Sequence, residues 1–92
     1  MSIRSRMRRA IWERRYIVSF HANEESSEDR FTTDDIKRIL LAGDVAQKFT
    51  NDPRGTRYKV VGEAADGRQG AVVCRFLPTG ELLIITVYAW EG

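Results

Sequence analysis

The spacing of apolar residues changes along the chain, and each change marks a new kind of predicted element. Near the start, apolar side chains recur at intervals of three and four, the period of an amphipathic helix, at Ile3, Met7, Ala10 and Ile11. Arginines fill the intervening positions, so residues 1–15 are expected to form a helix with a basic outer face. Residues 14–18 lose this period and gain aromatic and β-branched side chains, which predicts a short extended link.

Residues 19–43 are predicted to form a pair of helices. Ser19 is a suitable N-cap for the first of them. Thr32 can cap the second, with Asp35 three residues later in the relation of a capping box. Gly43 is expected to end that helix in a left-handed conformation. The buried stripe of the second helix consists of Ile36, Ile39 and Leu40.

After Gly43 the apolar period becomes two, which is the period of a strand. The pattern predicts strands at residues 45–50, 57–64, 70–76 and 81–89. The Asp-Gly pair at residues 66–67 favours a type I′ hairpin turn. We therefore expect an α+β fold, in which N-terminal helices pack on one face of an antiparallel four-stranded meander sheet over residues 45–90. Because 92 residues support one modest core, we predict a single domain over residues 1–92.

The last predicted strand is apolar at nearly every position. If its side chains alternate regularly, one face contains Leu83, Ile85, Val87 and Ala89, which we expect under the helices, and the other contains Leu82, Ile84, Thr86, Tyr88 and Trp90. A strand that is apolar on both faces is usually covered on both. We favour a cover from within the chain, and Tyr88 and Trp90 are candidates for an interface.

Composition excludes several classes of protein. No segment has the roughly 18 apolar residues that a membrane helix needs, and the basic N-terminus lacks the apolar core of a signal peptide. Cys74, the single cysteine, lies within an apolar strand and is expected to be buried and unreactive. These features predict a cytoplasmic protein that does not associate with membranes.

Charge is distributed in alternating blocks. Residues 1–15 hold six arginines and one glutamate, residues 21–35 hold six acidic residues and one arginine, and residues 45–60 hold four basic residues and one aspartate. The two basic blocks suit an anionic partner such as RNA. Alternatively, the first block partly neutralises the acidic block inside the fold.

Several short motifs together resemble the family known as domain of unknown function 4258 (DUF4258). They are Ser-x-His-Ala at 19–22, Gly-Asp-Val at 43–45, Asp-Pro-Arg-Gly at 52–55, Val-Val-Gly at 60–62, Asp-Gly-Arg at 66–68 and Ile-Ile-Thr-Val-Tyr at 84–88. The resemblance covers roughly residues 16–88. It implies a likeness to the small RelE, MqsR and BrnT-like toxins, which pack helices on one antiparallel sheet. By this likeness the chain would be an mRNA-cleaving toxin with an antitoxin protein as its partner.

The chain departs from the family pattern at three positions. Many relatives carry arginine where this chain has Glu25 and Asp29, and many carry a histidine where it has Ala71. A cleavage site that depends on those groups would be weakened here.

Metal-independent RNA cleavage needs a proton acceptor, cations that hold phosphate and an acid for the leaving oxygen. His21, Arg54 and Tyr88 are the predicted catalytic residues, with His21 moving protons and Tyr88 stacking or orienting a base. The predicted phosphate-binding residues are Arg57, Lys59, Arg68 and Arg75. For Arg54, a solvent-exposed turn with a local pair to Asp52 is an equal alternative.

His21 also has alternative interpretations. A lone histidine is often structural, with its ring packed and one nitrogen bonded to the backbone. Glu24, Glu25 and Glu28 follow it at helical spacing and could form a metal site with it, but a solvated helix face is strongly favoured. No metal or other cofactor is predicted, since motifs for ATP, NAD and zinc do not occur.

The alternative function is a non-catalytic interaction domain. It would bind a protein partner or RNA through the arginine-rich first helix and the final strand, and a homodimer is compatible with both functions.

Overall fold

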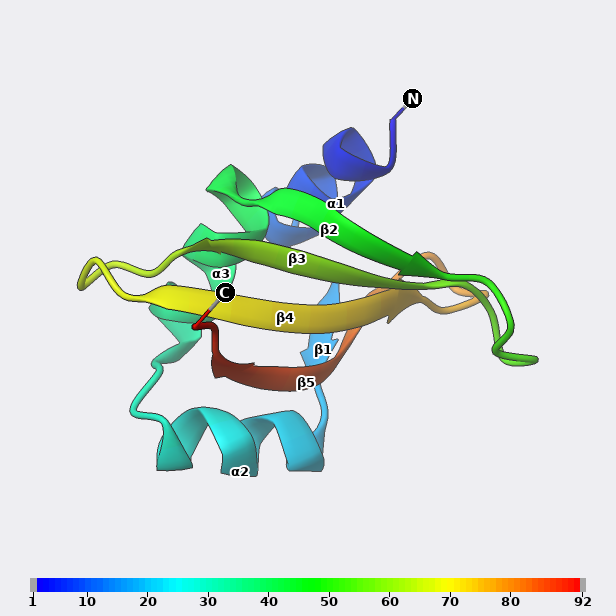
Figure 1. Cartoon of the computed structure of the whole chain (residues 1–92). Coiled ribbons are helices and arrows are strands. Elements are labelled where there is room, and N and C mark those ends of the chain that lie inside the picture. The colour runs from blue at the N-terminus through cyan, green and yellow to red at the C-terminus, as the bar shows by residue number, and fades with distance from the viewer. Residues whose placement is uncertain (1, 92) are drawn as a thin grey trace.

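The computed structural model describes residues 2–91 and confirms the predicted α+β class. Its elements are α1 (Ile3–Trp12), β1 (Tyr16–Val18), α2 (Phe20–Glu28), α3 (Thr33–Ala42), β2 (Asp44–Phe49), β3 (Arg57–Glu63), β4 (Gln69–Phe76) and β5 (Leu82–Ala89). The strands form one sheet in the order β1-β5-β4-β3-β2. Figure 1 looks onto the sheet with α1 and α3 behind it and α2 alongside β5.

Each of the three helices begins at a capping residue, and the caps at Ser19 and Thr32 are the predicted ones. Ser2, Ser19 and Thr32 each accept a hydrogen bond from a backbone N–H in the first turn, and Thr32 and Asp35 form the predicted capping box. The longest of these helices has 10 residues, and within residues 2–91 none is long and apolar enough to cross a membrane.

Gly43 ends α3 for a different reason from the predicted one. Its φ of −76° and ψ of 177° are extended, so the expected left-handed stop is wrong. A Cβ atom on Gly43 would lie 2.5 Å from the carbonyl oxygen of Ile39 and 2.6 Å from that of Val61. The glycine is needed because the end of α3 and strand β3 approach each other too closely for a side chain.

The predicted extended link is a strand of the sheet. Tyr16–Val18 pairs in parallel with Leu82–Ile84, which makes the sheet five-stranded and mixed, beyond the predicted four-stranded meander. Three residues are too few to show a period of two, and the partner lies more than sixty positions away. The antiparallel meander from β2 to β5 is confirmed.

A bulge in β5 corrects the predicted faces of that strand. Val73 pairs with Thr86 whereas the next residue, Cys74, pairs with Ile84, so Ile85 is an extra residue in β5. The alternation therefore shifts by one at Ile85. Leu82, Ile84 and Val87 are fully buried among the core residues, and Leu83, Thr86 and Tyr88 share the opposite face with their β4 partners. Before the bulge the predicted faces are wrong, because Leu82 and Ile84 lie in the core. After the bulge they are confirmed, since Val87 lies in the core and Tyr88 on the opposite face.

The Asp-Gly turn also differs from the prediction. Gly67 has a φ of 90°, but Asp66 does not have a positive φ, as a type I′ turn would require. The N–H of Gly67 donates to the carbonyl of Ala64, and the N–H of Ala64 donates to the carbonyl of Arg68. This is a type I turn closed by a left-handed glycine, the commonest three-residue hairpin loop.

Helices α1 and α3 bury their apolar stripes against one face of the sheet. The largest side chains enclosed there are Met7, Ile36, Ile39, Leu40, Leu82 and Ile84. Full burial of an aliphatic side chain of this size contributes roughly 1.5–3 kcal/mol, so this layer is the main source of stability.

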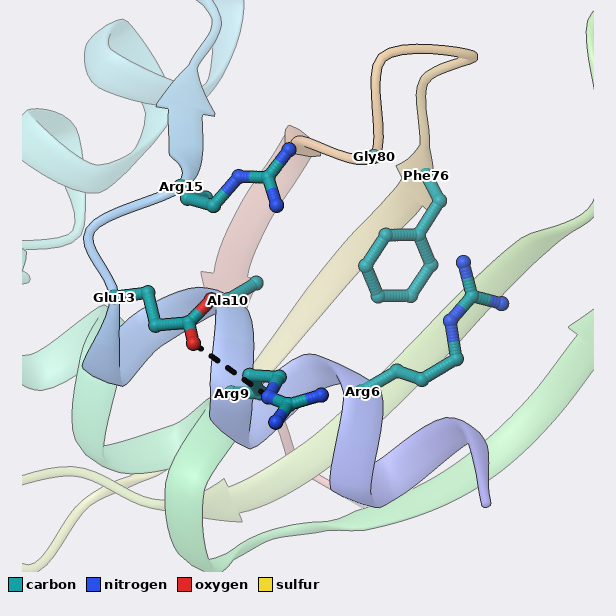
Figure 2. Close-up of a pocket in the computed structure, with 7 residues that line it drawn as sticks. All are labelled: Arg6, Arg9, Ala10, Glu13, Arg15, Phe76 and Gly80. Atoms are coloured by element: carbon teal, nitrogen blue, oxygen red, sulfur yellow. Dashed lines mark ion pairs between the residues drawn. The ribbon is translucent and has the colours of Figure 1, made fainter. Parts of the chain in front are cut away.

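Arginines attach α1 to the rest of the fold. The guanidinium of Arg4 pairs with Asp44 at 2.8 Å, and Nε of Arg8 donates to the carbonyl of Leu41 at 3.0 Å. Arg6 lies over the ring of Phe76, with its Cζ 4.1 Å from the ring centroid (Figure 2). Several of the arginines predicted for the outer face of α1 therefore contact the domain.

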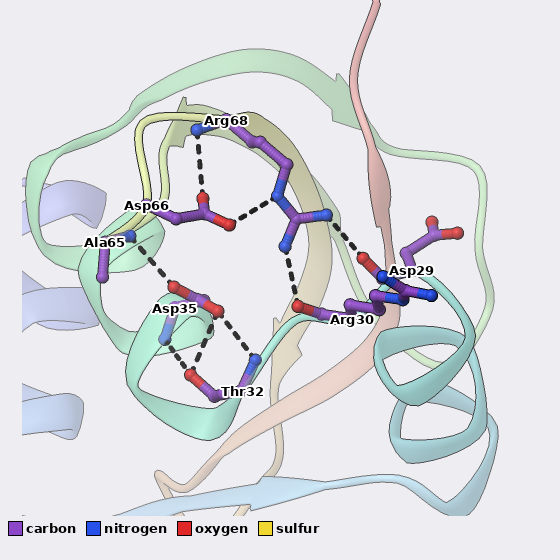
Figure 3. Close-up of polar contacts among 7 residues, drawn as sticks. All are labelled: Asp29, Arg30, Thr32, Asp35, Ala65, Asp66 and Arg68. Carbon is purple, nitrogen blue, oxygen red and sulfur yellow. Dashed lines mark hydrogen bonds and ion pairs between the residues drawn. The ribbon is translucent and has the colours of Figure 1, made fainter.

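A polar cluster joins the β3–β4 hairpin to the segment between α2 and α3 (Figure 3). Asp35 is 5% exposed; its Oδ2 accepts from the N–H and hydroxyl of Thr32, and its Oδ1 accepts from the N–H of Ala65. Arg68 donates to Asp66 and to the carbonyls of Asp29 and Arg30. The bonds of Ala65 to Asp35 and of Arg68 to the carbonyls of Asp29 and Arg30 join the two segments, which fixes the hairpin against the helices.

Replacing Asp35 with alanine should destabilise the domain by about 2–3 kcal/mol, because it leaves the N–H groups of Thr32 and Ala65 without an acceptor. Urea denaturation monitored by circular dichroism measures this loss. Asp34→Ala is the matched control, since Asp34 lies in the same helical turn but is exposed. Equal losses in the two variants would contradict a role for the Asp35 hydrogen bonds.

The same cluster predicts a dependence on pH. The backbone N–H of Thr32, above all, holds the pKa of Asp35 below its ordinary value of 3.8, with further help from the Thr32 hydroxyl and Ala65 and against the effect of burial. A lowered pKa stabilises the fold at a pH above the ordinary value, and this contribution disappears as the pH falls through the pKa of the folded state. The difference in unfolding free energy between wild type and Asp35→Ala should therefore shrink below roughly pH 4.

Candidate functional site

The face of the sheet opposite α1 and α3 combines basic and aromatic side chains. Side chains on this face alternate along each strand with those of the core, and residues paired across strands share a face. By this register the face includes Phe49 from β2, Arg57 and Lys59 from β3, Arg75 from β4 and Tyr88 from β5, and Trp90 joins them just beyond β5. We call these six residues the basic-aromatic face. None of the helices within residues 2–91 covers it (Figure 1).

Cations and rings are interleaved on the basic-aromatic face. Nζ of Lys59 lies 4.1 Å from the ring centroid of Trp90, and Cζ of Arg57 lies 5.0 Å from that of Phe49. Tyr88 and Trp90 contact each other edge to face, with centroids 6.3 Å apart. Lys59 forms no ion pair with any of residues 2–91, so its charge is not neutralised by the described part of the fold.

Two arginines of the face retain unused hydrogen-bonding capacity. Nε of Arg75 and Nε of Arg57 are buried, and neither has a hydrogen-bond partner among residues 2–91. Nε of Arg57 approaches Asp52 to 3.2 Å, close enough for an ion pair but not aligned for a hydrogen bond. Buried donors without acceptors are rare in folded proteins, so these two groups stand out among the polar atoms of the face.

The loop between β2 and β3 adds Arg54 at one end of this face. The backbone N–H and Nε of Arg54 both donate to Oδ1 of Asp52, at 2.9 and 3.3 Å. These hydrogen bonds, the backbone one first, hold the pKa of Asp52 below its ordinary value. A hollow of about 440 Å³ lies along the loop, bordered by Phe49, Arg54 and Arg57 among others. The local pair of Arg54 with Asp52 is thus present, and the phosphate-binding role of Arg54 stays a prediction.

Arg68 is separated from the face by its own hydrogen bonds. All three of its guanidinium nitrogens donate to groups within the fold, and its Cζ lies 4.2 Å from the centroid of Phe31 (Figure 3). These contacts give it a structural role in the hairpin cluster. Its phosphate-binding role stays a prediction.

His21 lies on α2, beside the outer edge of β5. Its side chain is 67% exposed, and its Nε2 is 3.3 Å from Oε1 of Glu25. The same carboxylate oxygen accepts the N–H of Val87 at 3.1 Å, so the imidazole stands next to the strand that carries Tyr88. Within residues 2–91 no three histidine, cysteine or carboxylate side chains gather as metal ligands would, and Glu24 and Glu28 are exposed.

The structure groups four of the seven predicted site residues and separates the other three. Arg57, Lys59, Arg75 and Tyr88 share the basic-aromatic face, whereas Arg68 and His21 lie outside it. Arg54 lies in the loop beyond the pair of Phe49 and Arg57, whereas Tyr88 lies toward the other end of the sheet. Tyr88 pairs with Ala71, four residues along β4 from Arg75, which is a distance of roughly 13 Å. The predicted catalytic residues do not form one compact site.

The sequence analysis assigned no role to Phe49 and named Trp90 only as an interface candidate. The sequence nevertheless contains a pattern that indicates the positions of both rings. Phe49 ends a strand of period two that faces Arg57 across a short turn, and Trp90 follows Tyr88 at a spacing of two. Extending the alternation to these positions would have assigned both rings to the face.

The family model for "Domain of unknown function (DUF4258)" matches residues 18–89. The chain belongs to the DUF4258 family. The match includes α2, α3 and the strands β2 to β5, and it leaves α1 outside. Comparisons with curated proteins and with solved structures gave no match.

Within the DUF4258 domain, the acidic residues at positions 25 and 29 have a structural role. Strand β1 pairs with β5 only as far as Ile84. Beyond it, the N–H of Val87 donates to the carboxylate of Glu25 and the N–H of Ala89 donates to that of Asp29, at 3.1 and 2.9 Å. Where the resemblance led us to expect arginine, this chain uses carboxylates that close the edge of its sheet.

Replacing Asp29 with alanine should destabilise this DUF4258 domain by about 1–2 kcal/mol, because the N–H of Ala89 loses its acceptor. Glu28→Ala is the control, since Glu28 is exposed one position earlier on the same helix. Amide hydrogen exchange is the direct readout: the Ala89 N–H should exchange faster in Asp29→Ala than in Glu28→Ala. Unchanged protection of Ala89 would show that the carboxylate does not close the edge.

Proposed function

We propose that this DUF4258 protein binds single-stranded RNA on its basic-aromatic face. The observation that carries the proposal is the arrangement of Lys59, Arg75 and Tyr88 on one uncovered sheet face, with the two cations outside any ion pair of residues 2–91. Proteins recognise single-stranded RNA by stacking bases on aromatic side chains and by pairing phosphates with Lys and Arg.

The geometry suits a flexible strand better than a folded duplex. Tyr88 and Trp90 stand edge to face, so each keeps a ring surface at a different angle, as splayed bases require. Arg57 and Arg75 bring two guanidinium groups to the same face, and guanidinium groups pair favourably with phosphate oxygens. The combination supports binding with little sequence preference, because every base offers a face for stacking.

We propose as a second function that the bound RNA is cleaved without a metal, in the manner of a RelE, MqsR or BrnT-like toxin. The observation that favours it is His21, exposed and held 3.3 Å from a carboxylate that is itself anchored on β5. His21 would take the proton of a 2′-hydroxyl as that oxygen attacks the phosphorus, and water would give a proton to the 5′-oxygen as its bond to phosphorus breaks. Glu25 would orient the imidazole, and Tyr88 would stack the adjoining base. An antitoxin protein would then be the natural partner.

For RNA binding, we expect Lys59→Gln and Arg75→Gln each to weaken affinity and to lower the slope of log Kd against log salt by about 0.7. Tyr88→Leu should cost about 1–3 kcal/mol of binding free energy through lost stacking. Fluorescence anisotropy with a labelled single-stranded RNA at several salt concentrations measures both effects. Arg38→Gln, an exposed arginine on α3, is the control with the same charge change. If Arg38→Gln weakens binding as much as Lys59→Gln does, the basic-aromatic face is not the site.

For cleavage, we expect His21→Ala to lose at least a hundredfold in rate, the contribution of a general base, while its melting temperature and RNA affinity stay close to wild type. Glu25→Gln should keep the acceptor for Val87 but reduce the rate, because it removes the charge beside the imidazole. Growth after induction of wild type and His21→Ala at matched levels tests the same idea in cells. If cells with wild type and with His21→Ala grow equally and both proteins bind RNA, the protein is a non-catalytic interaction domain.

A further inference from the structure

A second cationic site lies on the helix side of the sheet, between α1 and the turn that joins β4 to β5. It is an open hollow of about 250 Å³. Its lining consists of Arg6, Arg9, Ala10, Glu13, Arg15, Phe76 and Gly80. Figure 2 shows the arginine side chains and the ring of Phe76 extending into the space between the helix and the turn. We call this hollow the arginine pocket.

Positive charge in the arginine pocket exceeds negative charge. Three arginines converge there, with Glu13 as the only acidic lining residue. Glu13 pairs with Arg9, at a long distance of 3.5 Å. Arg6 is placed over Phe76 and Arg15 donates to the carbonyl of Thr79 at 3.0 Å, but neither has a carboxylate within ion-pair distance among residues 2–91. Like charges held close together are unfavourable, and an anion between them would relieve that cost.

The backbone leaves room for one of these guanidinium groups. Gly80 has a φ of 92°, and a Cβ atom at that position would lie 3.1 Å from a terminal nitrogen of Arg15. A larger residue would therefore press on the Arg15 guanidinium as well as strain the turn. The ring of Phe76 limits the hollow on another side, and its volume is below the roughly 300 Å³ at which sites for drug-sized ligands begin. The space suits one small anion.

We propose that the arginine pocket binds a phosphoryl group. Guanidinium groups match phosphate oxygens with paired, charge-assisted hydrogen bonds, and the three arginines approach the hollow from two different segments of the chain. The three arginines precede the region that matches the DUF4258 model, whereas Phe76 and Gly80 lie inside it. The pocket therefore needs this chain's N-terminal segment in addition to the family domain. It is independent of the proposed RNA site, which lies on the other face of the sheet.

The experiment is isothermal titration of the full chain with inorganic pyrophosphate at low salt. Wild type should bind one pyrophosphate, and Arg6→Gln should lose about tenfold or more in affinity, as expected for one charge-assisted contact. Glu13→Gln should bind more tightly than wild type, because the pocket loses its competing carboxylate. Arg38→Gln, on the exposed face of α3, should bind like wild type, and so should Lys59→Gln from the basic-aromatic face.

Two oligonucleotides of equal sequence, one with a 5′-phosphate and one with a 5′-hydroxyl, identify the source of the phosphoryl group. A preference for the 5′-phosphate that disappears in Arg6→Gln would assign the pocket to RNA ends, and equal binding would assign it to a small free phosphate. The proposal is overturned if wild type does not bind pyrophosphate, or if Arg38→Gln loses as much affinity as Arg6→Gln. Loss of RNA binding in Lys59→Gln with unchanged pyrophosphate affinity would separate the two sites.

Discussion

The outer edge of β5 is the constraint on which the rest of the arrangement depends. A strand edge that is buried or half-buried must find acceptors for its N–H groups, and β1 supplies them only as far as Ile84. Glu25 and Asp29 accept the next two outward N–H groups from positions one turn apart on α2. Helix α2 therefore lies alongside the sheet and not across it. The opposite face of the sheet stays uncovered as a consequence.

This arrangement also explains the separation of charge. The acidic block of the sequence contributes Glu25 and Asp29 to the edge of β5 and Asp35 to the hairpin cluster, all through backbone N–H groups. No ion pair among residues 2–91 joins the arginines of α1 to this block, so the acidic residues do not neutralise the first basic block by contact. Because these carboxylates bond to the backbone, they do not pair with Arg6, Arg15 or Lys59, which stay available to an external anion.

Features that depend on neighbouring residues in the sequence were predicted correctly for much of this fold. Features that depend on pairing between distant segments were not. The caps at Ser19 and Thr32 depend on a few neighbouring residues, and both are confirmed. The strand β1 and the bulge at Ile85 depend on partners far away in the sequence, and neither was predicted. For the site, alternation along β3 sufficed to place Arg57 and Lys59 together. Joining Arg75 and Tyr88 to them required the register of three strands, and the hydrogen bonds that occupy Arg68 required the position of the α2–α3 segment.

Ala71 shows why binding and catalysis would be divided between two places. It lies on the basic-aromatic face opposite Tyr88, yet it is fully buried. Since none of the described helices covers this face, side chains of neighbouring strands must bury the alanine. Lys59, whose Nζ lies over the ring of Trp90, is one of the side chains nearby. The centre of the face is thus closed over by side chains, as suits stacking, and it has an alanine at the position where the family resemblance leads one to expect a histidine. A proton-transferring residue would have to stand at the rim, where His21 is held by the carboxylate that closes the β5 edge.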